Sequence, residues 1–139
     1  MGSTSYKVLI VDDSEDHRFL LKRALNKVAS FCVVAGAASD GEMAIEYLAG
    51  TGSFSDRAMF PFPDVMLLDL KMPRMSGFDV LRWVRKEKLD QLWVIVLSSS
   101  HLESDVAEAK ALGSHHYVVK EEIGVTACLI AKILEMGRV

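Results

Sequence analysis

Residues 65–69 read VMLLD, an apolar run that ends in an aspartate. Other short apolar runs lead in the same way into Asp12 and Asp13, into Ser98, and into Lys120. If these runs are parallel strands of one sheet, their carboxyl ends lie along one edge, which is where open α/β sheets bind their ligands. The sequence therefore predicts three carboxylates, a hydroxyl and an ammonium group at the same edge.

Segments with helical spacing of apolar residues separate the predicted strands. We expect helices over 14–28, from Asp40, from Ser76, over 103–112 and over 124–135, and a further strand over 31–37. This alternation favours an α/β fold, a doubly wound parallel sheet with helices on both faces. We expect the apolar residues of the first and last helices to face the core, among them Phe19, Leu20, Val28, Val125 and Leu129.

One connection is irregular. Residues 50–63 form a longer link than the usual 2 to 6 residues between a helix and a strand, and they mix turn formers with Phe54, Phe60 and Phe62. Two interpretations stay open. The favoured one is a loop whose aromatic side chains fold back onto the domain, and the other is a loop that binds a partner.

The composition fits one soluble domain. The chain has 139 residues, of which 50% are hydrophobic and 25% charged, and its net charge is −3. This length suits a single domain, and the charge gives no sign of a nucleic-acid-binding surface. No apolar stretch approaches the ~20 residues that span a bilayer. We therefore expect a cytoplasmic protein that contacts neither nucleic acid nor membrane.

The chain termini and cysteines add little. Residues 1–5 have neither the basic nor the apolar region of a secretory signal, so we expect a disordered terminus or a cloning remnant there and the domain over 6–139. Tyr6 stands where an N-myristoylation motif needs serine or threonine. Cys32 and Cys128 form no pattern with each other or with histidine, which favours buried thiols in a reducing compartment.

The predicted edge has a definite chemistry. Three aspartates within ~4–5 Å of one another repel by about 3–4 kcal/mol per pair at an effective dielectric of 20, so a cation is needed among them. Mg²⁺ is the natural choice because it binds carboxylate oxygens and keeps places for phosphate. Asp69 is then the candidate nucleophile for an acyl phosphate. Lys120 would offer a mobile charge and Ser98 a hydroxyl donor to the phosphoryl oxygens.

These residues lie in segments that resemble a known family. The chain resembles the receiver domain of bacterial two-component response regulators over about residues 6–136. The segments that carry the resemblance are VDDSED (11–16), SDGEMA (39–44), LLDLKMPRMSGFD (67–79), VLS (96–98) and YVVK (117–120). Together they are specific, although no single one would be.

The resemblance implies a flavodoxin-like fold with five parallel strands in the order 2-1-3-4-5 and five helices. It implies that Asp69 accepts a phosphoryl group from a phosphohistidine on a sensor histidine kinase or a histidine phosphotransfer protein. Mg²⁺ would be bound by Asp13, Asp69 and the backbone carbonyl of Lys71, with Asp12 acting mostly through water.

The resemblance also implies how the signal is read. Ser98 would move toward the phosphoryl group and Tyr117 would turn inward, which would remodel the face formed by the fourth and fifth helices and the last strand. Such a protein catalyses only its own phosphorylation and dephosphorylation. We expect a stand-alone regulator, monomeric or homodimeric, that acts on a downstream protein, similar to small receivers that serve bacterial phytochromes.

Two features depart from the family pattern, and other functions compete. Glu121 replaces the usual proline after the lysine, which leaves the geometry of the Lys120–Glu121 bond and the reach of Lys120 open. The long 50–63 link is the second departure. The leading enzyme alternative, a phosphatase of the haloacid dehalogenase type, needs an acid two residues after the nucleophile, where Lys71 stands.

Two further alternatives and the histidines complete the sequence reading. A nucleotide-binding module lacks its glycine-rich motifs here, whereas a receiver-like scaffold without phosphorylation stays possible. The histidines are interpreted as surface or core residues, at positions 17, 101, 115 and 116.

Overall fold

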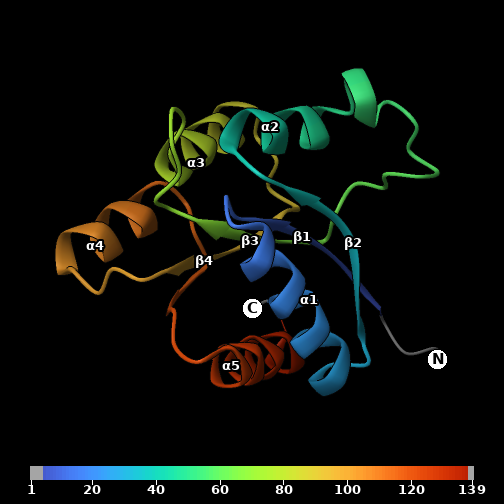
Figure 1. Cartoon of the computed structure of the whole chain (residues 1–139). Helices are drawn as coiled ribbons and strands as arrows, with labels where there is room; N and C mark the ends of the chain where they lie inside the picture. Colours follow the sequence, from blue (N-terminus) through green and yellow to red (C-terminus); the bar gives the residue numbers. More distant parts are fainter. Residues whose placement is uncertain (1–4, 138–139) are drawn as a thin grey trace.

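The computed structural model describes residues 5–137 and shows one parallel sheet alternating with helices (Figure 1). The strands are β1 (Tyr6–Val11), β2 (Cys32–Ala38), β3 (Val65–Asp69), β4 (Trp93–Ser98) and β5 (His116–Val119). The helices are α1 (Glu15–Val28), α2 (Gly41–Ala49), α3 (Gly77–Lys86), α4 (Glu103–Ala111) and α5 (Ile123–Met136). The sheet order is β2-β1-β3-β4-β5, with every pair parallel, which confirms the predicted fold.

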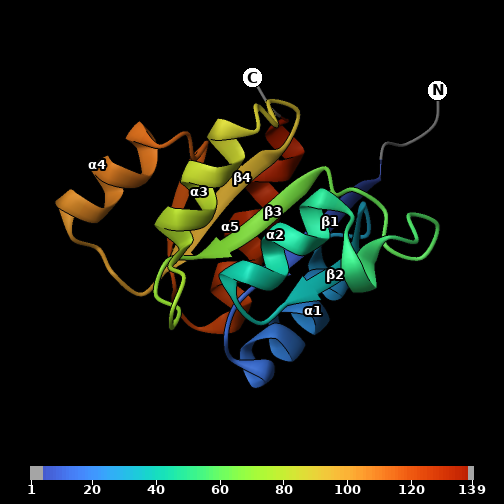
Figure 2. The ribbon, with the colours of Figure 1, turned by 90° about the horizontal axis from the view of Figure 1, so that it is seen from above.

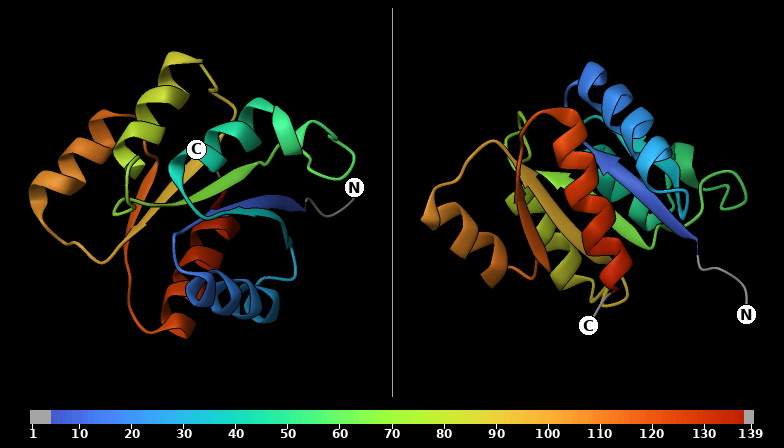
Figure 3. Two further views of the ribbon diagram at one scale, coloured as in Figure 1. Left: turned by 45° about the horizontal axis from the view of Figure 1, so that its top comes forward. Right: turned by 90° about the horizontal axis from the view of Figure 1, so that it is seen from below.

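The sheet lies between two helical layers. Helices α2 and α3 cover one face, and α1 and α5 cover the other (Figures 1 and 3). Every residue of β3 and β4 is buried, because both strands are central and covered on both sides. Their uninterrupted apolar sequences follow from this double burial. In the view from above, α4 projects away from the rest of the domain (Figure 2).

The helices begin at the residues that the sequence indicates. The side chains of Ser14, Asp40 and Ser76 each accept a hydrogen bond from a backbone N–H in the first turn of α1, α2 and α3. These bonds satisfy donors that a helix start otherwise leaves free. After α4 the chain reverses at Gly113, whose φ of 104° favours glycine. Local sequence thus determines where α1, α2 and α3 begin and where the chain turns after α4.

The predicted inward faces of α1 and α5 are partly wrong. Leu21 and Leu25 of α1 and Ile130 of α5 are buried as expected. Several other residues of the predicted faces are exposed, namely Phe19 (61%), Leu20 (45%), Val28 (41%), Val125 (44%) and Leu129 (39%). The two helices pack beside each other on the sheet, so each has only a narrow stripe that can be covered. The remaining apolar residues form an open flank.

The connector, residues 50–63, folds back onto the domain, as the favoured interpretation predicts. It contains a short 3-10 helix, η1 (Gly52–Phe54), and Phe54 is buried against Tyr47 of α2. Arg57 donates hydrogen bonds to the backbone carbonyls of Tyr47 (2.8 Å), Leu48 (2.8 Å) and Phe60 (3.0 Å). One side chain therefore joins the connector to the end of α2.

The cysteine prediction holds for one residue only. Cys32 is buried, and burial raises the pKa of its thiol to about 11. Cys128 is exposed on α5, so the expectation of a second buried thiol is wrong. Its position on the open flank of α5 explains the difference. Both thiols are free. Across residues 5–137, no helix combines the length and apolar character needed to span a bilayer. The expected disorder of residues 1–4 lies outside the described residues.

Candidate functional site

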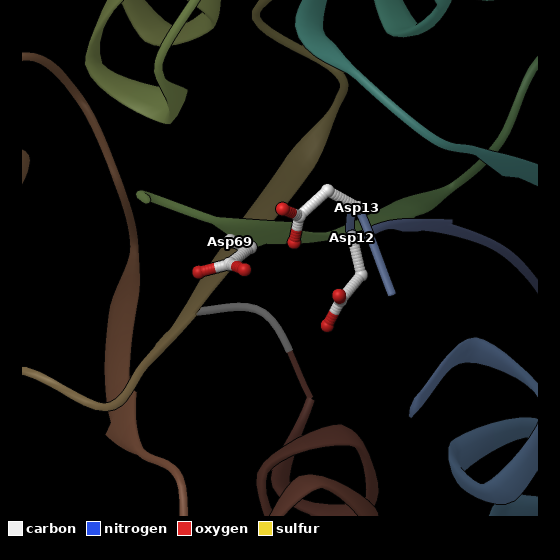
Figure 4. Close-up of side chains that lie close together, drawn as sticks. All are labelled: Asp12, Asp13 and Asp69. Atoms are coloured by element: carbon white, nitrogen blue, oxygen red, sulfur yellow. The ribbon is translucent and has the colours of Figure 1, made fainter. Parts of the chain in front are cut away.

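The three predicted aspartates meet at the carboxyl edge of the sheet. Strand register pairs Val11 with Leu68, so that Asp12 and Asp69 follow as neighbours at the ends of β1 and β3. Carboxylate oxygens of Asp12, Asp13 and Asp69 lie within 4.8 Å of one another (Figure 4). Asp12 and Asp69 are buried, whereas Asp13 is exposed. The predicted acidic cluster is therefore present.

Lys120 reaches this cluster from the end of β5. Its Nζ atom lies 3.2 Å from Oδ2 of Asp12 and 3.2 Å from Oδ2 of Asp69. No peptide bond in residues 5–137 is cis, so the bond before Glu121 is trans and Lys120 still reaches both aspartates. The loop after Lys120 is held by the Glu121 N–H, which donates to the hydroxyl of Thr126 at 3.0 Å. The departure from proline does not remove the lysine from the site.

Asp12 is surrounded by donors. Its Oδ2 accepts from Nδ1 of His17 at 2.5 Å, and its Oδ1 accepts from the backbone N–H of Ser14 at 2.9 Å. Burial raises the pKa of Asp12, but these hydrogen bonds and the charges of Lys120 and His17 outweigh it and lower the value to about 2. This carboxylate is therefore firmly ionised.

Asp69 has fewer donors. The backbone N–H of Lys71 lies 3.3 Å from its Oδ1, and Lys120 contacts its Oδ2. Burial raises the pKa of Asp69, and the negative charge of Asp12 adds to this effect, while Lys120 opposes it. In its ionised form, Asp69 is therefore less stabilised by the protein than Asp12 is. Its carboxylate oxygens can accept a further ligand.

Ser98 ends β4, the strand next to β3, and both Ser98 and Tyr117 contact Ser100. The Ser98 hydroxyl is fully buried and accepts from the backbone N–H of Ser100 at 3.1 Å. The Tyr117 hydroxyl donates to the backbone carbonyl of Ser100 at 2.8 Å. Both predicted switch residues thus contact the same residue of the loop between β4 and α4.

A close approach of backbone explains the glycine in the segment LLDLKMPRMSGFD (67–79). Gly77 follows Asp69 by eight residues and is the first residue of α3. A Cβ atom at this position would collide with the backbone carbonyl of Asp69 and with Cα of Leu70. The Gly77 N–H also donates to the Leu70 carbonyl at 3.0 Å. Glycine is required here so that α3 can pack against the strand end.

The acidic set fits a divalent cation. Hard cations such as Mg²⁺ prefer carboxylate oxygens, and the clustered oxygens of Asp12, Asp13 and Asp69 provide them from two strand ends. The exposed position of Asp13 leaves one side of the cluster open to solvent. Binding by the Lys71 carbonyl stays a prediction.

Sequence reasoning missed part of the site. The sequence predicts a surface or core residue at position 17, but the ring of His17 contacts Asp12. Arg18 of the same helix turn donates to the backbone carbonyl of Asp12 at 2.7 Å. A signal was available, since the Ser14 cap places the first turn of α1 directly after the acidic strand end. The other histidines, His101, His115 and His116, are exposed as expected.

Comparisons with known proteins point to one family. Residues 8–127 match the family described as the response regulator receiver domain. A protein-glutamate methylesterase/protein-glutamine glutaminase from Anaeromyxobacter dehalogenans is 38% identical over 129 residues, which cover 93% of this chain and 33% of that protein. The chain spans between about a third and a half of the length of the curated relatives that it matches.

Solved structures superpose over nearly the whole chain. The phosphorylated cyanobacterial phytochrome response regulator RcpA matches with a TM-score of 0.80 and 26% identity, covering 96% of this chain and 94% of that one. The Mn²⁺-bound form of response regulator Rcp1 matches with a TM-score of 0.77 and 26% identity, covering 96% of both chains.

Proposed function

The chain belongs to the receiver-domain family of response regulators, and from this premise we propose that Asp69 is its phosphoryl acceptor. The donor would be a phosphohistidine on a sensor histidine kinase or a histidine phosphotransfer protein. A carboxylate oxygen of Asp69 would attack phosphorus, the phosphorus–nitrogen bond would break, and the released imidazole would take up a proton. The product would be an acyl phosphate on Asp69.

The observation that carries this proposal is the contact of one lysine with two unequal carboxylates. Lys120 lies 3.2 Å from both Asp12 and Asp69. Asp12 has two further donors on its oxygens, whereas Asp69 has one, the backbone N–H of Lys71 at 3.3 Å. The carboxylates of Asp12, Asp13 and Asp69 lie close together at the strand ends (Figure 4). Lys120 would therefore be able to bind an oxygen of a phosphoryl group on Asp69, while Asp12 stays ionised beside it.

We propose that the acidic cluster binds Mg²⁺ through Asp12, Asp13 and Asp69. When bound, this cation neutralises the charge of the carboxylates and of the transferred group. The chain's own residues do the rest: Ser98 would donate to a phosphoryl oxygen, and the backbone N–H of Lys71 already faces Asp69 at 3.3 Å. The Mn²⁺-bound form of Rcp1 supports a divalent ion in a fold of this type.

The output would pass through a protein partner. We propose that Ser98 and Tyr117 respond together to the phosphoryl group, because both contact Ser100. The protein would then catalyse only its own phosphorylation and dephosphorylation. Similarity to the phytochrome response regulator RcpA supports a light-sensing kinase as one class of donor. Action in the cytoplasm, as a monomer or homodimer, belongs to the same proposal.

Phosphorylation can be tested on intact protein by mass spectrometry. Incubation with acetyl phosphate and Mg²⁺ should add a single acid-labile mass of about 80 Da to the wild type. Asp69→Asn should stay unlabelled, because the amide cannot form an acyl phosphate. Asp56→Asn, which changes an exposed aspartate of the connector, should be labelled like the wild type. Equal labelling of Asp69→Asn and wild type would show that the acceptor lies elsewhere.

A further inference from the structure

Helix α4 is attached to the domain in a different way from α5. Helix α5 buries five residues. In α4 only Ala109 is buried, whereas Val106 of this helix and Leu102 just before it are exposed. The far end of α4 is tied to α3, because Arg85 donates to the Ala111 carbonyl at 2.7 Å. Its first turn depends on polar contacts and is the part of the helix that projects from the domain (Figure 2).

Asp105 gathers these polar contacts. It lies in the first turn of α4, and its side chain is only 14% exposed. Its Oδ2 atom accepts a hydrogen bond from the Ser100 hydroxyl at 2.6 Å. The same oxygen lies 3.6 Å from Nζ of Lys71. One carboxylate oxygen of α4 is therefore shared by two residues from different loops.

Lys71 and Ser100 each also contact a residue of the candidate site. The backbone N–H of Lys71 faces Oδ1 of Asp69, at 3.3 Å. The backbone N–H of Ser100 donates to the hydroxyl of Ser98. Two separate paths thus lead from the site, one through β3 and one through β4, and they meet at Asp105.

The ion pair between Lys71 and Asp105 is weak, so Lys71 can exchange Asp105 for another anion with little loss of free energy. The Lys71 side chain is 61% exposed and the two charged atoms are 3.6 Å apart, which is the geometry of a weak surface ion pair. A phosphoryl group adds a charge of about −1.5 to −2 at neutral pH. On Asp69 this charge would appear two residues from Lys71, within reach of the flexible lysine chain. The ammonium group would then have a stronger partner than Asp105.

We propose that Asp105 is a positioning residue that competes with the phosphoryl group on Asp69 for the Lys71 ammonium. Phosphorylation takes Lys71 away from Asp105, and the first turn of α4 loses one of its anchors. This inference rests on the proposed function of Asp69. It assigns to one ion pair the link between the state of the site and the position of α4.

The competition predicts a measurable coupling. Fluoroberyllate with Mg²⁺ mimics a phosphoryl group on aspartate, and its affinity can be measured by calorimetry on the full chain. Asp105→Asn keeps an oxygen that can accept from Ser100 but removes the charge that holds Lys71. Its affinity for fluoroberyllate should rise by about threefold, the scale of an exposed ion pair. Coupling between two sites is reciprocal. The gain in affinity for the mimic therefore measures how strongly Asp105 of α4 binds Lys71 in the unmodified protein.

A double-variant cycle separates this role from a structural one. In a Lys71→Met background, Asp105→Asn should leave the affinity unchanged, because the cation over which the two anions compete is gone. Glu103→Gln is the matched control: it removes a charge from the same helix turn, and the ion pair of Lys71 is with Asp105 rather than with Glu103. Its effect should be well below threefold.

Amide hydrogen exchange supplies the second readout. Fluoroberyllate should speed exchange in the first turn of α4 in the wild type by about threefold, whereas Asp105→Asn should start fast and change little. Equal tightening by Asp105→Asn in both lysine backgrounds, or no tightening at all, would overturn the proposal while leaving Asp69 as acceptor. A wild type that binds no fluoroberyllate would overturn the proposed function, and this inference with it.

Discussion

Asp12 and Asp69 end neighbouring strands and share Lys120, but the structure treats them differently. Asp12 accepts hydrogen bonds from His17 and from the Ser14 N–H, and its pKa is lowered to about 2. Within residues 5–137, Asp69 has one backbone N–H donor besides Lys120, and its pKa is raised by burial and by the charge of Asp12. The fold thus stabilises one carboxylate by itself and leaves the other to be stabilised by what binds there.

This contrast separates two demands on an acidic site. A carboxylate that only provides charge can be fully hydrogen-bonded by the protein. A carboxylate that reacts must keep lone pairs free, and in a buried position that costs stability. Substitution of the two aspartates should therefore change the free energy of unfolding in opposite directions.

The largest effect is expected from the paired amide variants. At pH 7 without metal, Asp12→Asn should lower the free energy of unfolding by about 2 kcal/mol, because the variant loses a carboxylate whose pKa is lowered in the fold. Asp69→Asn should raise it, since a carboxylate that the fold disfavours is removed. Urea unfolding at constant pH measures both changes, and equal signs for the two variants would contradict the contrast.

The pH dependence of stability tests the direction of both changes in a second way. Asp12 contributes stability above the ordinary aspartate range near pH 4, and this contribution is lost as pH falls toward about 2. Asp69 has a raised pKa, so its penalty is absent below pH 4 and grows as pH rises through that range. The difference between each variant and the wild type should therefore shrink on acidification.

A smaller effect is expected from Mg²⁺. At about ten times its Kd, a ligand that binds only the folded state adds about 1.4 kcal/mol, which corresponds to roughly 4 °C in Tm for a domain of this size. Asp13→Asn is the matched variant: Asp13 is exposed, so its loss should hardly change stability without metal but should reduce the shift with Mg²⁺. A full shift in this variant would remove Asp13 from the ligand set.

The smallest effect is expected at His17. His17→Leu removes one donor to Asp12 and should cost about 1 kcal/mol, since part of the hydrogen bond is solvent-exposed. In an Asp12→Asn background the same change should cost much less, because the charged acceptor is gone. Urea unfolding of the four proteins gives the coupling energy. A coupling near zero would show that His17 does not stabilise the Asp12 carboxylate.

The sequence allowed most of this site to be predicted, for a physical reason. Residues at the ends of parallel strands must share one edge, so Asp12, Asp69, Ser98 and Lys120 could be placed together before any coordinates were known. Helix starts were equally predictable, because a cap such as Ser14 bonds only to its own first turn.

Contacts that depend on the orientation of a helix were not predictable. Whether His17 or Phe19 faces the domain depends on how α1 rotates against α5, and helical periodicity alone does not determine this rotation. The same holds for Asp105, whose importance appears only when α4 is seen beside Lys71. Residues that touch across elements therefore need the structure, whereas residues at element ends do not.

The joint between Arg57 and the end of α2 has a practical consequence. Because Arg57 binds two carbonyls of α2 and one of the connector, the residues between them can change in number without moving the sheet. The connector loops out past β2 in Figure 1. Met59 is exposed and lies between Arg57 and Phe60 in the connector. A fluorescent dye attached at this position would report on tumbling and association of the protein while leaving the chemistry at the strand ends undisturbed.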